Sequence, residues 1–221
     1  MIHFNVITIF PEMFSSYIKE SLISRAQEKK LIKITTHNLR DFADDARGTV
    51  DGRPFGGGLG MVLKPEPIFK ALKKIKKAKK SKIILFTPRG KKFTQKLAYQ
   101  FSKLDQVIFI CGRYEGVDQR VAEKMADIEL SIGDYDLMGG ELPAMVAIEA
   151  ISRLVGGVLG KEALLKERVT KSGGFIEYAQ YTRPEIFEPQ KGKKWKVPGV
   201  LLSGDHKKIE AWKTQHGKVI E

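Results

Sequence analysis

Hydrophobic residues in roughly the first 150 positions follow two alternating periods. Short apolar runs, typical of buried strands, are separated by segments whose apolar residues recur every three to four positions, as on one face of a helix. The apolar runs predict strands at residues 2–9, 31–36, 82–87, 106–111 and 128–132. The helical pattern begins at Pro11 and Pro65 and returns at residues 93–101, 117–125 and 142–155. This alternation predicts an α/β fold, a parallel sheet with helices on both faces.

The pattern changes after Gly160. Residues 161–175 are polar and contain glycine, which is typical of a linker, and residues 176–221 show little apolar periodicity apart from Ile209 and Trp212 in a terminal helix. We therefore expect an α/β domain at residues 1–160, an interdomain linker at 161–175 and a small helical domain at 176–221.

The net charge of the chain indicates what kind of partner the protein binds. The chain has 39 Lys and Arg against 26 Asp and Glu, a formal net charge of +13. Such an excess favours a polyanion, nucleic acid before an anionic membrane surface, although a lysine-rich source proteome would produce the same excess. No apolar run approaches the roughly 20 residues of a membrane helix, and residues 1–10 lack the basic start of a signal peptide. We expect a soluble, cytoplasmic protein.

Cysteine and histidine give little sign of a metal. Cys111 is the only cysteine, which excludes an internal disulfide and a thiolate zinc site. The four histidines are scattered, and none pairs with another at metal-ligand spacing. We predict no transition-metal site.

Glycine-bearing turns follow three of the predicted strands. They are Pro88–Gly90, Gly112–Gly116 and Gly133–Asp136, the last leading to Gly139 and Gly140. Because ligands of open α/β sheets bind at the carboxyl ends of strands, these turns predict one pocket, although each could be an ordinary turn. Another loop, residues 51–60, has five glycines in ten residues, which suits either close approach of a ligand or a plain turn.

Several common cofactor motifs are absent from the sequence. The first predicted strand is followed by Phe10-Pro11-Glu12 rather than by a G-x-G-x-x-G turn. The chain also lacks the G-x-x-x-x-G-K-[ST] phosphate loop and the G-x-S-x-G nucleophile elbow. These absences disfavour NAD, ATP and serine-hydrolase chemistry.

Five longer motifs are characteristic of one family. They are RPFGGGLGM at 53–61, CGRYEGVD at 111–118, GGELPAM at 139–145, YTRP at 181–184 and VLLSG at 200–204. Across nearly its whole length the chain resembles the bacterial tRNA (guanine-N1)-methyltransferases, the TrmD family of the SPOUT class. The resemblance implies an α/β domain with a deep C-terminal trefoil knot, a rare exception to unknotted chain topology.

The resemblance also implies S-adenosylmethionine as methyl donor, tRNA as substrate and a homodimer with active sites at the subunit interface, away from any membrane. The glycine-bearing turns would hold the donor in a bent shape. Matched by position, the donor site comprises Thr87, Pro88, Gly112, Tyr114, Glu115, Ile132, Gly133, Asp134, Tyr135, Asp136, Leu137, Gly139 and Gly140.

Methylation of guanine N1 needs two catalytic groups. N1 carries a proton at neutral pH, so a base must remove it, and a cation or hydrogen-bond donor must stabilise charge on O6. By resemblance Arg153 binds O6 and Glu167 is the base. The chain departs from the family pattern near Glu167. A match to the family without a gap places Val169, which cannot act as a base, at the position of the base. Glu177 is the second candidate for the base. Glu167 could also be only a solvated linker charge.

The resemblance further indicates how RNA would be held. Asp51, Arg53 and Gly58 are expected near the target guanine. Phosphates of the anticodon stem would be bound by a basic tail that includes Arg183, Lys191, Lys193, Lys194 and Lys196. Trp195 would either lie in a core or stack on RNA.

Magnesium and two other functions stay open at this point. The family implies a possible Mg²⁺ requirement, but Asp44, Asp45 and Asp51 form no ion-loop pattern. The alternatives to the main function are a non-catalytic RNA-binding protein on the same fold and a SPOUT methyltransferase for another RNA nucleotide.

Overall fold

The computed structural model describes residues 1–160 and 168–220. The chain forms two compact units, Met1–Leu165 and Lys166–Glu221. No helix in the described residues is long and apolar enough to cross a lipid bilayer.

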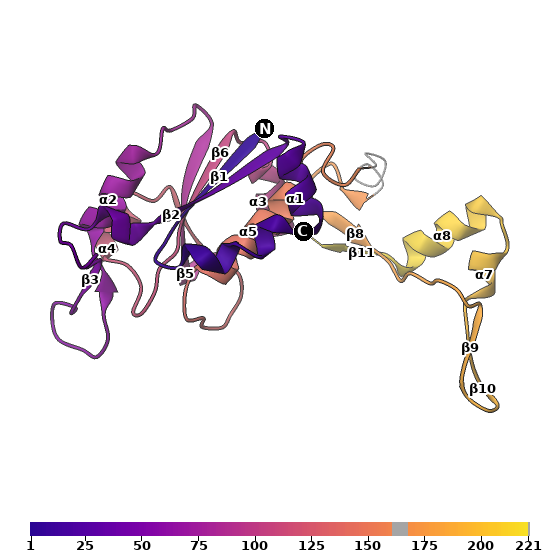
Figure 1. Cartoon of the computed structure of the whole chain (residues 1–221). Coiled ribbons are helices and arrows are strands. Elements are labelled where there is room, and N and C mark those ends of the chain that lie inside the picture. Colours follow the sequence, from indigo (N-terminus) through magenta and orange to yellow (C-terminus); the bar gives the residue numbers. More distant parts are fainter. Residues whose placement is uncertain (161–167, 221) are drawn as a thin grey trace. The chain divides into compact units, whose positions relative to one another are not determined.

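A five-stranded parallel sheet forms the centre of the first unit, which confirms the predicted sheet (Figure 1). Its order is β2-β1-β6-β5-β7, and every neighbouring pair is parallel. The strands are β1 (Ile2–Thr8), β2 (Ile32–Asn38), β5 (Ser81–Lys92), β6 (Gln106–Ile110) and β7 (Ile128–Ser131). Strand β5 is five residues longer than expected at its carboxyl end, because after a break at residues 87–90 it pairs again with β7.

Helices cover both faces of this sheet, α2 and α4 on one and α1, α3 and α5 on the other (Figure 1). Their bounds are α1 (Ser21–Glu28), α2 (Pro65–Lys74), α3 (Gln95–Phe101), α4 (Gln119–Lys124) and α5 (Glu141–Ser152). The helix expected from Pro11 is broken into two 3₁₀ helices, Pro11–Phe14 and Tyr17–Lys19, followed by α1. Ser21 has a left-handed backbone, φ 52°, which a continuous right-handed helix excludes.

The core consists of apolar side chains between the sheet and its helices. On the α2 and α4 face, strand residues such as Ile7 and Ile108 pack with Ile68 of α2 and Val121 of α4. Phe109 stacks between Phe4 and Phe86, with ring centroids 6.2 and 5.5 Å apart. Burying one large apolar side chain stabilises the folded state by about 1.5–3 kcal/mol. Many such side chains hold the strands in place, and with them the strand ends that carry the loops.

The segment between β2 and α2, which includes the glycine-bearing loop at residues 51–60, contains a 3₁₀ helix (Leu39–Phe42) and a small antiparallel pair. Strands β3 (Asp51–Gly52) and β4 (Val62–Leu63) form this pair and hold the glycine-rich residues between them.

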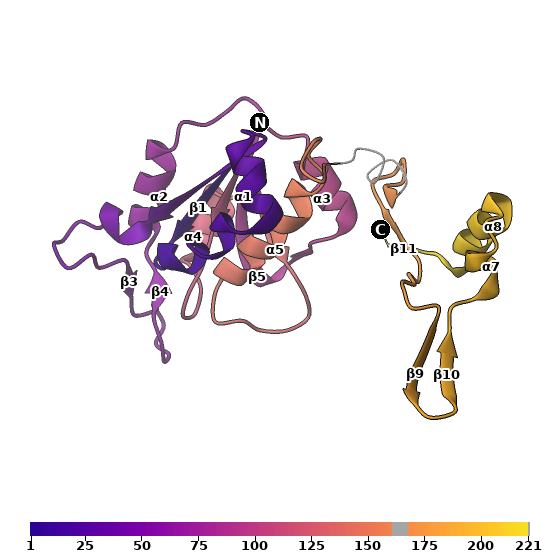
Figure 2. The same cartoon turned by 45° about the vertical axis from the view of Figure 1, so that its right-hand side comes forward.

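The second unit contains helices and also strands that the sequence did not predict. Helices α7 (Gly199–Leu202) and α8 (His206–His216) accompany the antiparallel pairs β8 (Phe175–Glu177) with β11 (Lys218–Ile220) and β9 (Ile186–Gln190) with β10 (Lys193–Lys196). Within this unit the β9–β10 hairpin extends away from α7 and α8 (Figure 2). The strands are short and largely exposed, so they lack the apolar alternation by which strands are predicted.

Candidate functional site

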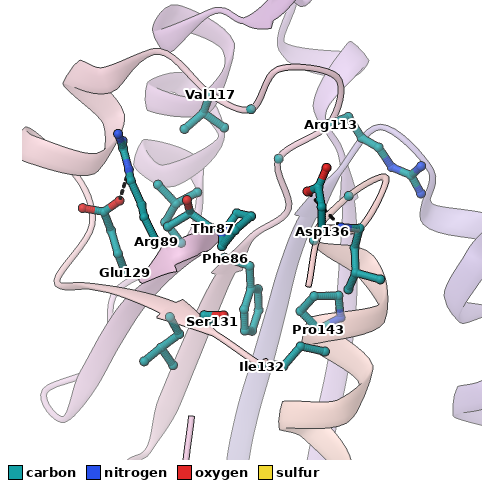
Figure 3. Close-up of a pocket in the computed structure, with 18 of the residues that line it drawn as sticks. Phe86, Thr87, Arg89, Arg113, Val117, Glu129, Ser131, Ile132, Asp136 and Pro143 are labelled. Carbon is teal, nitrogen blue, oxygen red and sulfur yellow. Dashed lines mark hydrogen bonds and ion pairs between the residues drawn. The ribbon is translucent and has the colours of Figure 1, made fainter. Parts of the chain in front are cut away.

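A cavity of about 550 Å³ lies at the carboxyl ends of β5, β6 and β7 (Figure 3). Its size is within the usual range of small-molecule sites. The three predicted turns meet here, as expected from parallel strands that end at one edge of the sheet. The predicted donor-site residues in its wall are Thr87, Pro88, Gly112, Tyr114, Glu115, Ile132, Gly133, Tyr135, Asp136, Leu137, Gly139 and Gly140.

Asp134 is the one predicted donor-site residue that does not line the cavity. Its exposed carboxylate accepts a hydrogen bond from Lys92 Nζ at 2.6 Å. Asp136 does line the cavity, and its Oδ1 accepts from the backbone N–H of Leu137 at 2.9 Å (Figure 3). The acidic turn after β7 therefore presents one carboxylate to the cavity and one to a lysine of β5.

Two glycines allow backbone segments to approach each other behind the cavity. A Cβ on Gly90 would lie 2.6 Å from backbone atoms of Leu130, and a Cβ on Gly140 would lie 2.8 Å from Cys111 Cα. Both distances are shorter than real Cβ contacts, and backbone atoms have little room to move away. Glycine is needed here because β5 and β7, and likewise β6 and α5, come too close for any side chain.

A buried ion pair joins the second and third turns. Glu141 is fully buried, and its Oε2 accepts from Arg113 Nε at 2.8 Å. Its Oε1 accepts from the Thr8 hydroxyl at 2.7 Å. The Arg113 guanidinium lies 4.7 Å from the ring centroid of Phe10, and its side chain extends away from the cavity (Figure 3). The pair links CGRYEG to GGELPAM, a connection that the sequence analysis did not anticipate.

The loop that follows β6 is strained at Tyr114, whose φ of 59° is unusual for a residue with a side chain. Glu115 follows, with its N–H donating to the Met61 carbonyl at 3.0 Å. A Cβ on Gly60 would come within 2.7 Å of Glu115 Cγ and Oε1. The glycine-rich loop is thereby held against one wall of the cavity.

The predicted substrate residues Asp51, Arg53 and Gly58 lie on this glycine-rich hairpin and do not line the cavity. Arg53 and Gly58 are exposed, and Gly58 has a φ of 124°. Phe55 and Leu59 are almost completely exposed beside them, at 100% and 95%. Such exposed apolar residues are typical of a loop that contacts a partner.

The cavity contains a charged pair that the sequence reasoning missed. Arg89 Nε lies 3.6 Å from Glu129 Oε2 (Figure 3), and Arg89 also donates a hydrogen bond to Gln119 Oε1. Glu129 Oε2 is buried, and apart from this ion pair it has no hydrogen-bond partner among the described residues. Its position on a predicted strand gave no sign that this side chain would face a cavity.

Arg153, the predicted catalytic arginine, is exposed and caps the C-terminus of α5. Ten residues of helix separate it from Pro143, which lines the cavity, and at 1.5 Å per residue this is about 15 Å. Arg153 instead lines a shallower hollow of about 430 Å³ with Tyr17, Gln95, Met145, Val146, Glu149 and Ala150. Burial and a 2.6 Å hydrogen bond to Glu149 raise the pKa of Tyr17, which therefore stays a neutral donor.

The predicted base, Glu167, lies outside the described residues. Its fallback, Glu177, accepts a 3.1 Å hydrogen bond from Arg168 Nη1 and is about half exposed. Val169, at the ungapped position, forms a β-bridge with Phe175. Glu177 and Val169 thus have structural contacts of their own.

Neither metal nor thiol chemistry has a visible site in residues 1–160 and 168–220. No group of three or more His, Cys, Asp or Glu side chains is placed there to hold a metal ion. Burial raises the pKa of the Cys111 thiol well above its usual value, and Glu141 adds to this. Cys111 is therefore an inert core residue behind Gly140.

Comparison with known proteins gives a consistent match over nearly the whole chain. Residues 2–219 match the sequence profile of the family described as tRNA (Guanine-1)-methyltransferase TrmD. A protein of Dictyoglomus turgidum named tRNA (guanine-N(1)-)-methyltransferase is 50% identical over 213 residues, 96% of this chain and 84% of that protein. Proteins of the same name from Staphylococcus carnosus and Clostridioides difficile are 47% and 45% identical, covering 94% and 96% of this chain and 82% and 90% of their own lengths.

Proposed function

The chain belongs to the tRNA (guanine-1)-methyltransferase family, and on that premise we propose that it transfers a methyl group from S-adenosylmethionine to N1 of the guanine on the 3′ side of the anticodon, position 37 of tRNA. The observation that carries the proposal is the cavity formed by the three glycine-bearing turns at the carboxyl ends of β5, β6 and β7. We place this activity in the cytoplasm, where tRNA is modified.

The cavity suits the donor chemically. Phe86, Ile132 and Pro143 offer apolar surface for an adenine ring, and the carboxylates of Glu115 and Asp136 suit the positive charge of a sulfonium group. S-adenosylmethionine supplies an electrophilic methyl group when bound. The trefoil knot implied by the family is part of this proposal.

The separation between Arg153 and the cavity favours a homodimer. Arg153 lies about 15 Å along α5 from Pro143 in the cavity wall, which is too far for both to contact one guanine base within a single chain. The same helix exposes Leu142 and Val146, four residues apart and 53% and 46% accessible. We infer that a second copy covers this face and brings its own Arg153 to the cavity, so that active sites form between subunits.

Catalysis then depends on two side chains near guanine. Arg153 binds O6 and stabilises the negative charge that develops there. Glu167 removes the N1 proton, and Asp51, Arg53 and Gly58 of the glycine-rich hairpin hold the base. Because Glu177 is paired with Arg168, Glu167 is the better candidate for the base.

The decisive experiment measures transfer of labelled methyl groups to an unmodified tRNA transcript with guanine at position 37. The matched control transcript carries adenine there. We expect labelled N1-methylguanine only in the first transcript, loss of activity in Glu167→Ala and retained activity in Glu177→Ala. EDTA in the same assay tests whether Mg²⁺ is required.

Two other outcomes would replace the proposal. RNA binding without any methyl transfer by the wild-type protein would identify a non-catalytic RNA-binding protein. Methylation of a different nucleotide would identify a SPOUT methyltransferase of other specificity.

A further inference from the structure

The β9–β10 hairpin of the second unit carries an exposed aromatic pair. All residues of both strands are exposed, including Phe187 at 51% and Trp195 at 54%. Large aromatic side chains that stay exposed together are unusual on a soluble protein and typically mark a binding surface. Trp195 is thus not a core residue of the second unit.

The hairpin presents both rings on one face. Trp195 and Phe187 are opposite each other in the strand register, with ring centroids 5.6 Å apart and planes at 67°. Lys193 Nζ lies 5.8 Å from the Trp195 ring centroid, so this cation is on the same face. The neighbouring pair, Ile186 and Lys196, points to the opposite face because side chains alternate along a strand.

The turn of the hairpin is closed by its own hydrogen bond. Gly192 has a φ of 82°, and its N–H donates to Glu188 Oε1 at 2.6 Å. This bond occupies an acceptor of the nearest carboxylate. Residues 189–197 contain no other acidic side chain and include Lys191, Lys193, Lys194 and Lys196.

We propose that this aromatic and basic face binds an unpaired nucleotide of the tRNA, with its base stacked on Trp195 and its flanking phosphates against the hairpin lysines. The proposal rests on the proposed function in so far as tRNA is the substrate. Aromatic side chains bind unstacked bases in RNA loops, whereas bases in a duplex are already stacked on each other. The four lysines also disfavour the same hairpin of a second copy as occupant, because their like charges would then face each other.

Binding of a tRNA transcript by Trp195→Ala tests the stacking. Stacking on an aromatic residue is worth about 5- to 150-fold in affinity, so we expect a loss in this range, seen as a raised KM with little change in kcat. Trp195→Phe should restore most of the affinity. Ile186→Ala is the matched control, since it removes an apolar side chain from the opposite face of the same hairpin.

Salt dependence separates stacking from phosphate contact. Trp195→Ala should leave the slope of log affinity against log salt unchanged, whereas Lys194→Ala should reduce it by about one. The chain has two tryptophans, so Trp212→Phe leaves Trp195 as the only indole, and its fluorescence should be quenched when tRNA binds. This readout does not depend on removing Trp195.

Three results would overturn the inference. The first is unchanged tRNA affinity in Trp195→Ala, and the second is a loss of tRNA affinity in Ile186→Ala equal to that in Trp195→Ala. The third is a Trp195→Ala variant with a changed sedimentation coefficient and unchanged tRNA binding, which would show that a second copy binds this face. If the wild-type protein methylates guanine 37 while any of these holds, the stacking proposal fails alone. If the wild type neither binds nor methylates tRNA, the proposed function fails with it.

Discussion

The two units of this chain are stabilised in different ways. Buried hydrophobic side chains lie between residues 2 and 158, and none is found among residues 168–220. The second unit instead relies on aromatic contacts such as Trp212 with Tyr181 and His216, whose ring centroids are 6.2 and 4.3 Å away. A small-molecule cavity needs the rigid, close-packed support of a core, whereas a surface for a polyanion needs mainly charge and exposed rings.

The largest expected effect that distinguishes the roles of the two units is the loss of activity in Arg153→Ala. If Arg153 stabilises charge on O6 as proposed, its loss should lower kcat by about 10²- to 10³-fold, while tRNA affinity stays near that of the wild type. Single-turnover methyl transfer with saturating tRNA measures this, and Arg153→Lys is the control that keeps the charge. A change in KM alone would mean that Arg153 contributes only to binding, the role proposed for the hairpin of the second unit.

Next in size is the buried pair of the first unit. Glu141→Gln keeps the shape of the side chain but leaves Arg113 without its counter-charge, which should lower the free energy of unfolding by about 3–5 kcal/mol. Urea denaturation measures the loss. Asp134→Asn removes one partner of the exposed pair with Lys92 and should cost at most about 1 kcal/mol. An equal loss in the free energy of unfolding in the two variants would show that the buried pair contributes no more to stability than the exposed pair.

A smaller effect is expected where β5 passes close to β7. Gly90→Ala forces a Cβ against the Leu130 backbone, and such overpacking costs about 1–3 kcal/mol. Affinity for S-adenosylmethionine, measured by calorimetry, should fall as well, because residues 87–89 line the cavity. Gly156→Ala is the control, since a Cβ there meets nothing within 4 Å. Normal donor binding in Gly90→Ala would show that the close approach is not required.

The smallest effect concerns pH and the edge of the sheet. Burial, followed by the charge of Lys74, lowers the pKa of His37 below its usual 6.5. His37 Nε2 lies 2.9 Å from Asn5 Oδ1. Between the pKa of His37 in the folded protein and 6.5, the unfolded chain binds more protons than the folded one. The contribution of neutral His37 to stability is therefore fully present above pH 6.5 and is lost as the pH falls through this window.

His37→Asn should flatten this pH dependence of the urea midpoint. His3, whose pKa is lowered by burial, then by Lys33 and His37, will retain part of it. An unchanged slope in the double variant His3→Asn, His37→Asn would assign the pH dependence to other groups.

The sequence predicts the structure best where local pattern and packing agree. The apolar runs predicted all five strands of the parallel sheet, and the glycine-bearing turns predicted a pocket at their carboxyl ends. It failed for β9 and β10, because an exposed hairpin has no apolar alternation to detect. It also missed Glu129, since a carboxylate inside a strand shows its direction only once the strand is placed in the sheet.

The sequence by itself determined the α/β class, the turns where glycine is required and, through its motifs, the family. These depend on residue type and spacing along the chain. Only the tertiary structure decided that Glu141 is buried against Arg113, that Asp134 pairs with Lys92 rather than lining the cavity, and that α5 separates Arg153 from the cavity. Each of these joins or separates residues through the packing of whole elements, which no spacing along one segment encodes.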